Sequence, residues 1–184
     1  MRRWKQVKWA ETGQITEILG WPKTGHDADP PEAFFDRLIE EGRDDDAAMF
    51  LGQALPRFEV VAWAARTVQD LSLPSSAHDA EALKATLLWL QDPSDGRRRA
   101  AFQIAEQSHG ASPQKMCALA AFFSGGSVAS ADVEPVLPPK DTAGAFAAGA
   151  VLTAATDSGR REEGLRTALA LGDALASGRE AARP

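Results

Sequence analysis

The sequence has little of the chemistry that catalytic and metal sites use. Its 184 residues include one cysteine, Cys117, and no tyrosine, and its three histidines (His26, His78 and His109) fall in three separate predicted loops. A single cysteine forms no disulfide within the chain, and an apolar stretch surrounds it, so we expect a buried side chain in a reducing compartment. No histidine has another ligand at helical or hairpin spacing, so we expect no metal site and no cofactor.

The chain also has no long hydrophobic run and no excess of positive charge. Its longest stretch of small and apolar residues, 143–155, has about thirteen residues, against the roughly twenty that a spanning helix needs. The basic start, Met1-Arg2-Arg3, is followed by lysines and a glutamate instead of the apolar core of an export signal. The net charge is −6, whereas nucleic-acid-binding proteins present a basic face. We therefore expect a cytoplasmic protein that binds neither membranes nor nucleic acid.

What the sequence does have is alanine, leucine and the signals that begin and end helices. Residues 116–123 are eight apolar residues in a row, preceded by Ser112 and Pro113 as cap and first turn. The polar segment Ser124-Gly125-Gly126-Ser127 follows, and we expect Gly125 to be the left-handed residue that ends the helix. A helix that is apolar on all sides needs neighbours all round, which places this one at the centre of a helical fold.

Similar signals predict helices along most of the chain. The expected ranges are 13–19, 30–41, 44–55, 56–68, 79–90, 93–105, 113–123, 142–156 and 161–176. They predict an all-α protein, a compact orthogonal bundle of about eight or nine short helices. Stacked helix pairs are the alternative, although the sequence shows no repeat of fixed period. The predicted organisation is an N-terminal arm and short helix (1–29), a single helical domain (30–177) and a frayed tail (178–184).

Small residues recur at four-residue spacing in the helix expected at 142–156. Ala145, Gly149 and Thr153 share this spacing, and small side chains let two helix backbones approach closely. We therefore expect the tightest helix contact of the fold at Gly149.

The first nine residues combine positive charge with tryptophan. Their basic residues are Arg2, Arg3, Lys5 and Lys8, with Trp4 and Trp9 interleaved. One interpretation is an arm folded against the acidic body, with its tryptophans in a groove. The other is an arm that docks on a partner, because tryptophan and arginine are favoured at binding hot spots.

Other polar clusters have structural interpretations as well. The turn at residues 124–127 lacks the following lysine and helix of a phosphate-binding loop, so we expect a helix end there. Arg97, Arg98 and Arg99 point in three directions on a helix, and we expect at least one to pair with Asp92 or Asp95. Stacking of Arg98 on Trp89 is an alternative, and a solvated side chain is the ordinary outcome. The acidic run at 44–46 fits a helix N-terminus better than a calcium loop.

Three segments together resemble an uncharacterised family of small helical bacterial proteins. They are residues 50–64, 89–106 and 118–129, the last followed by the proline pair at 138–139. The residues that match the family pattern are Leu55, Pro56, Arg57, Trp63, Trp89, Pro93, Arg98, Ser124, Gly125, Gly126 and Ser127. The similarity covers roughly residues 45–175, and members often carry two tryptophans where this chain has Ala62-Trp63. The resemblance implies no activity, and it implies an accessory role in bacterial secretion or contact-dependent systems.

The leading hypothesis is a non-enzymatic protein–protein interaction module. It would act as an adaptor, chaperone or accessory protein of a bacterial multiprotein system such as a secretion system, with another protein as partner. The candidate contact residues are Trp4, Trp9, Trp21, Arg57, Trp63 and Arg98. The alternative is an acidic immunity or inhibitor protein that neutralises a basic partner, since acidic charge would steer that encounter. A third hypothesis is an enzyme that uses the turn at 124–127 together with Arg98.

Overall fold

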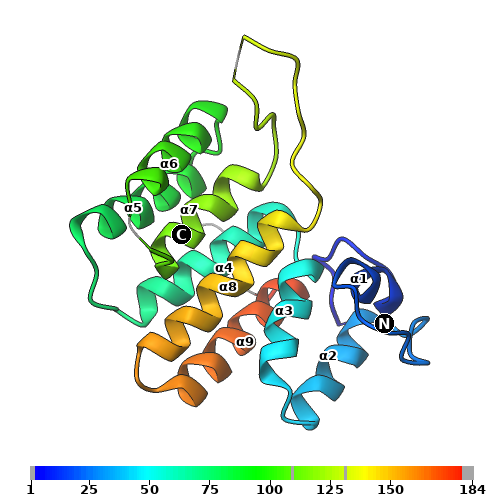
Figure 1. Ribbon diagram of the computed structural model, residues 1–184. Coiled ribbons are helices and arrows are strands. Elements are labelled where there is room, and N and C mark those ends of the chain that lie inside the picture. The colour runs from blue at the N-terminus through cyan, green and yellow to red at the C-terminus, as the bar shows by residue number, and fades with distance from the viewer. Residues whose placement is uncertain (1–2, 109, 131, 180–184) are drawn as a thin grey trace.

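The chain forms nine α-helices in a computed structural model, which describes residues 3–108, 110–130 and 132–179. These helices are α1 (Thr12–Ile18), α2 (Pro31–Glu40), α3 (Asp44–Ala54), α4 (Arg57–Asp70), α5 (Ala77–Gln91), α6 (Asp95–Gln107), α7 (Pro113–Phe123), α8 (Thr142–Asp157) and α9 (Arg161–Ser177) (Figure 1). The described ranges contain no β-strand. The predicted all-α bundle is confirmed. None of these helices has the length and hydropathy that a bilayer crossing requires.

The helix ends follow the local signals with small shifts. Ser112 caps α7 as expected, since its hydroxyl accepts a hydrogen bond from a backbone N–H of the first turn, and Pro113 is the first helical residue. The cap of α6 is Ser94, so that helix starts two residues later than predicted. At the end of α7 the left-handed residue is Gly126, with φ of +70°, and the expectation for Gly125 is wrong by one position.

Helix α7 lies at the centre of the bundle. It packs against α4, α5, α6 and α8, and Figure 1 shows it between the α5–α6 pair and α8. Cys117, Ala118 and Ala121 on α7 are completely buried. The four helices around α7 give the apolar segment at 116–123 neighbours on several sides, as its composition predicts. Helix α8 in turn contacts α3, α4 and α9.

The tightest helix contact involves α8, but not at Gly149. Gly52 on α3 and Gly144 on α8 place their backbones against each other, and a Cβ added to Gly52 would lie 2.7 Å from the Gly144 carbonyl oxygen. A Cβ on Gly149 would meet only the Met116 sulfur, at 3.3 Å. The spacing therefore identified the helix correctly, whereas the face in closest contact is the one that carries Gly144 and Ala148.

The N-terminal arm is packed against the helical body. The backbone N–H groups of Lys5 and Gln6 donate to the Ala176 carbonyl, each at 2.8 Å, and that of Lys8 donates to the Ala54 carbonyl at 3.0 Å. These bonds join the arm to the ends of α9 and α3. Of the two interpretations of this segment, the described residues 3–9 therefore support the folded arm. Arg2 and the end of the predicted tail, residues 180–184, lie outside the described residues.

The glycine contact between α3 and α8 gives a direct test of the packing. We expect Gly144→Ala to lower the free energy of unfolding by about 1–3 kcal/mol, because the new methyl group overlaps the α3 backbone. Gly149→Ala is the matched control on the same helix, and it should leave stability unchanged or raise it by up to about 1 kcal/mol through helix propensity. Chemical denaturation of both variants measures the difference. Equal effects of the two substitutions would contradict this packing.

Candidate functional site

The structure corrects the expectation that Trp4 and Trp63 are exposed contact residues. Trp63 has no exposed surface, and its indole N–H donates to the Ala168 carbonyl of α9 at 2.8 Å. Trp4 is 2% exposed, its ring lies 5.1 Å from that of Phe35, and its N–H donates to Asp173 at 2.7 Å. Each indole satisfies its polar atom while filling the core, which explains why a surface position was wrong.

The other two candidate tryptophans are half-buried. Trp9 donates its indole N–H to the Gln53 carbonyl at 3.1 Å, and Trp21 stacks on Phe50 with ring centroids 6.5 Å apart. Both side chains join the N-terminal segment to the bundle. That either also contacts a partner stays a prediction.

The candidate ligands and nucleophile do not come together. No group of three or more histidine, cysteine, aspartate or glutamate side chains in the described ranges could hold a metal ion. His26 pairs with Asp29 at 2.9 Å, and His78 lies exposed in α5, not in a loop; His109 is outside the described residues. Cys117 is buried, and burial raises the pKa of its thiol. It is therefore inert at neutral pH, because the thiolate is the reactive form.

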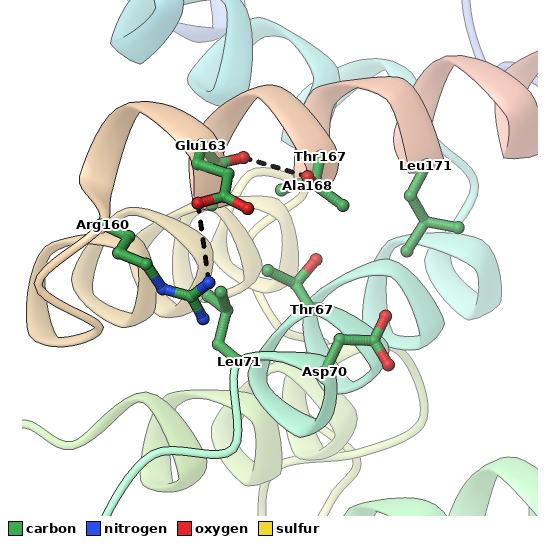
Figure 2. A pocket seen from close by; sticks show the side chains of 9 residues that line it. Thr67, Asp70, Leu71, Arg160, Glu163, Thr167, Ala168 and Leu171 are labelled. Atoms are coloured by element: carbon green, nitrogen blue, oxygen red, sulfur yellow. Dashed lines mark hydrogen bonds and ion pairs between the residues drawn. The ribbon is translucent and has the colours of Figure 1, made fainter.

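A small pocket lies between the end of α4 and the start of α9. Its volume is about 190 Å³, below the ~300–1,000 Å³ of ligand sites. Figure 2 shows Thr67 and Leu71 on one side of it and the ion pair of Arg160 with Glu163, at 3.5 Å, on the other. A wider hollow of about 620 Å³ lies between α2 and α9, where Arg3 reaches Asp36. Both hollows show ion pairs at the surface, and neither gathers groups suited to a reaction.

The most developed polar cluster centres on Arg98, which is 4% exposed. Its guanidinium donates to Asp95 at 2.6 and 3.0 Å, to the Phe122 carbonyl at 2.7 Å and to the Ser127 carbonyl at 2.7 Å. The expected pairing with Asp95 is correct. The solvated side chain and the stacking on Trp89 are wrong, because Arg98 lies over the ring of Phe122, with its Cζ 4.8 Å from the ring centroid. The guanidinium joins α6 to the end of α7.

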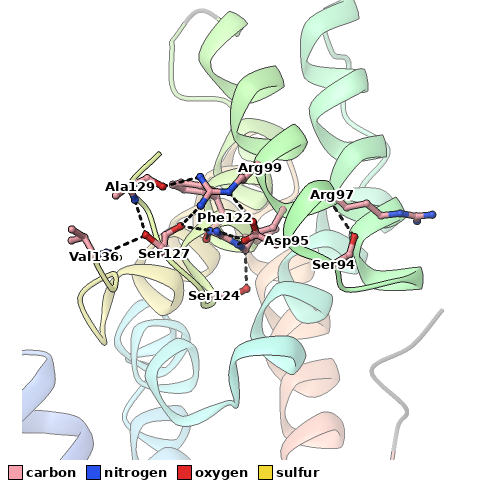
Figure 3. Close-up of polar contacts among 11 residues, drawn as sticks. Ser94, Asp95, Arg97, Arg99, Phe122, Ser124, Ser127, Ala129 and Val136 are labelled. Carbon is pink, nitrogen blue, oxygen red and sulfur yellow. Dashed lines mark hydrogen bonds and ion pairs between the residues drawn. The ribbon is translucent and has the colours of Figure 1, made fainter. Parts of the chain in front are cut away.

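Arg99 extends the cluster to the connection between α7 and α8. It donates to Asp95 at 2.8 Å, to the Ser127 carbonyl at 3.1 Å and to the Ala129 carbonyl at 2.9 Å. Figure 3 shows Arg99 beside Ser127 and Ala129, whereas Arg97 points away from them. We call Asp95, Arg98, Arg99 and Ser127 the arginine anchor.

The charges of the arginine anchor shift one pKa. Hydrogen bonds from Arg99 and then Arg98 lower the pKa of Asp95 below its usual value. A carboxyl group whose pKa is lower in the folded state stabilises that state above its unfolded pKa, near 4, and loses the contribution as the pH falls through its folded pKa. The anchor is therefore fully formed at neutral pH and weakens only in acid.

The arginine anchor holds the base of a projecting loop. The Ser127 hydroxyl accepts hydrogen bonds from the N–H groups of Ala129 and Val136, and the Val128 N–H donates to the Val136 carbonyl at 2.8 Å. Beyond this base the connection extends away from the helices (Figure 1). Three of its large apolar side chains are exposed: Val133 by 53%, Val136 by 54% and Leu137 by 75%. We call residues 132–137 the loop tip, although its segment returns to the base at Val136, whose backbone pairs with Ser127 and Val128.

Sequence reasoning missed the loop tip, although a signal for it was present. Val133, Val136 and Leu137 alternate with Pro135 and the proline pair at 138–139. Proline excludes this stretch from helix interiors and from central strands, so its apolar side chains had no regular element in which to be buried.

A notch lies next to the base of the loop. It has a volume of about 340 Å³ and is lined by Phe58 and Trp89, whose ring centroids are 5.7 Å apart, by Arg57 and by residues 93–95 and 124–126. Arg98 also lines it, paired there with the carboxylate of Asp95. The structure thus brings together Arg57, Arg98 and the turn at 124–126, which come from the three separate segments that carry the family resemblance. Gly126 is required here, because its φ is positive and a Cβ would meet the Arg98 guanidinium at 3.1 Å.

Arg57 brings an unpaired charge to the rim of the notch. It is exposed and forms no ion pair or hydrogen bond with any residue that the structure describes. Burial, together with the neighbouring charge of Arg57, lowers the pKa of Lys8 to about 8. Two cations therefore lie close together without a carboxylate between them.

The fold and this site define the class of the protein: an all-helical bundle with a projecting apolar loop that a buried arginine cluster holds at its base. A family model matches residues 34–176, and the chain belongs to that family of unknown function, DUF6931. No curated protein and no solved structure matches the chain significantly. The predicted membership of an uncharacterised family is confirmed.

The arginine anchor predicts unequal effects of neighbouring substitutions. We expect Arg98→Ala to lower the free energy of unfolding by about 2–4 kcal/mol, because it leaves the Phe122 carbonyl without its charged donor and removes one of the two arginines that bind the Ser127 carbonyl. Arg97→Ala is the control and should cost less than about 1 kcal/mol, since its ion pair with Asp92 and its hydrogen bond to the Leu88 carbonyl are both exposed to water. Thermal and chemical denaturation measure both. If both variants lowered the free energy of unfolding by similar amounts, the buried guanidinium of Arg98 would contribute no more to stability than the exposed one of Arg97.

Proposed function

We propose that the protein is a non-enzymatic protein–protein interaction module that docks through the loop tip. The observation that carries the proposal is the exposure of Val133, Val136 and Leu137 on a loop whose base is fixed by the arginine anchor. Water-exposed apolar side chains cost free energy that burial in an interface recovers. Fixing the base lowers the conformational entropy lost when the tip docks.

The chemistry of the loop tip favours one kind of partner surface. Pro135 and the prolines that follow lack a backbone N–H, so the tip is a poor strand for adding to a sheet edge. Proline-containing extended segments instead dock in apolar grooves lined by aromatic side chains. Glu134 adds a negative charge, which would pair with a basic residue on the partner.

The same contacts support a binding role over catalysis. The charged groups beside the turn at 124–127 are held in structural bonds: Asp95 accepts from both arginines, and Arg98 spans two carbonyl groups. An active-site arginine instead keeps donors free for the charge that develops in the reaction. The adaptor or accessory role in a bacterial secretion system is a finer proposal, and it rests on the family resemblance alone.

The acidic inhibitor is less well supported by the described residues. The most acidic segment of the chain, residues 44–46, is partly neutralised by neighbouring basic side chains. Asp45 pairs with Arg161 at 2.5 Å and Asp46 pairs with Arg43 at 2.8 Å. These pairs weaken the field that would steer a basic partner.

Site-specific crosslinking tests the proposed interface. A photo-crosslinking amino acid at position 137 should capture a protein in cells that express the chain, because Leu137 is the most exposed side chain of the loop tip. The same group at position 88 is the control, since Leu88 is also apolar and exposed, by 42%, but lies on α5 away from the loop. Gels and mass spectrometry identify the products.

We expect a discrete product at position 137 and none at position 88. Replacing Val133 and Val136 with serine in the position-137 protein should abolish the product while thermal stability is kept, since both side chains are exposed. Equal capture at both positions, or none at position 137, would contradict docking through the loop tip.

A further inference from the structure

The notch offers a surface that suits an extended acidic segment. Phe58, Trp89 and Pro93 give it an apolar, aromatic lining, and Arg57 stands on its rim. Gly125 and Gly126 expose backbone there, and a side chain at position 125 would approach Arg57 Nη1 to 3.5 Å. The absence of side chains on these two residues leaves the arginine and the apolar lining open to a ligand.

The charge at the rim is unusual for this chain. Most described arginines form ion pairs with carboxylates, including Arg3, Arg43 and Arg161. Arg57 and its neighbour Lys8 have no such partner among the residues that the structure describes. In a chain of net charge −6, two adjacent cations without carboxylate partners form a local positive site that attracts a carboxylate.

The loop tip carries the complementary chemistry. It contains Asp132 and Glu134, and neither pairs with a cation in the described ranges. Its apolar residues and Pro135 match the aromatic lining of the notch, which is the combination by which proline-containing segments are recognised. The notch and the loop tip are thus complementary: both have apolar surface, and the notch carries positive charge where the loop tip carries negative charge.

The positions of notch and loop allow two copies to exchange loops. Gly126 lines the notch and Ser127 begins the loop, so the two complementary surfaces adjoin each other. Glu134 is two residues from Val136, which pairs with Ser127 and Val128 at the loop base, so its backbone lies within about 7 Å of Val136. When each copy offers both surfaces at one end, a twofold axis satisfies both contacts at once and closes the assembly at a dimer.

We propose that the loop tip of one copy docks in the notch of a second copy, with Glu134 paired to Arg57, and that this exchange forms a twofold dimer. The inference rests on the proposed function, since it names the partner of the loop tip. It assigns the notch as a binding site for an acidic, proline-containing segment, and it makes each copy both donor and acceptor.

Charge reversal across the contact tests the exchange. The full-length chain, Arg57→Glu and Glu134→Arg are compared by sedimentation equilibrium over a range of concentrations. We expect the unchanged chain to be a dimer, and each single variant to raise the dissociation constant by at least about tenfold, because like charges then face each other at both contacts. Arg166→Glu, which reverses an exposed arginine on α9, is the control and should leave dimerisation intact.

The decisive arm mixes the two single variants in equal amounts. In a mixed dimer, the unchanged Glu134 of one variant meets the unchanged Arg57 of the other. At the second contact, the arginine introduced at position 134 meets the glutamate introduced at position 57. Opposite charges then face each other at both contacts, so the mixture should regain the dimer.

A double variant that carries both reversals, Arg57→Glu and Glu134→Arg, should form the dimer by itself, without a second variant in the mixture. A monomeric unchanged chain, dimeric single variants or a monomeric mixture would each overturn the exchange. If position 137 still captures a different protein while the chain is monomeric, the proposed function stands and only the loop exchange fails.

Discussion

The burial of one guanidinium group constrains the arrangement of this end of the molecule. Arg98 is almost completely buried, and a buried charge is tolerated only when its donors are satisfied. Its partners come from α6, from the end of α7 and from the start of the loop, so these three parts must be positioned together. Removing any one would leave the others with unpaired polar groups. The charge thus specifies a geometry as well as contributing stability.

The rest of the bundle reaches its close packing through small residues. Gly52 and Gly144 let the backbones of α3 and α8 touch, and Gly172 makes room for Leu51 and the Trp63 indole. Such contacts let the helices approach closely, consistent with the many buried alanines, while buried side chains such as Trp63 and Phe50 fill the remaining space. In the proposed function, this packed core gives the arginine anchor a fixed platform from which the loop projects.

Much of this fold follows from local signals, whereas the site does not. A cap such as Ser112 acts within one helical turn, so the sequence locates helix starts to within a few residues. The burial of Trp63 depends on a carbonyl 105 residues away, and that of Arg98 on Ser127, 29 positions later. The contact at Gly144 likewise depends on how α3 crosses α8. Spacing identifies pairs within one helix, but only the fold brings distant partners together.

The central claim is that Arg98, together with Arg99 on the same Ser127 carbonyl, holds the loop in place. Amide hydrogen exchange of Val128 and Val136, whose N–H groups form the hydrogen bonds at the loop base, tests it most directly in the unchanged chain and in Arg98→Lys. Lysine keeps the charge but cannot span both carbonyl groups. We predict that both amides exchange slowly in the unchanged chain and much faster in the variant, while Val151 in α8 stays protected in both. Equal protection of Val128 and Val136 in the two proteins would contradict the account.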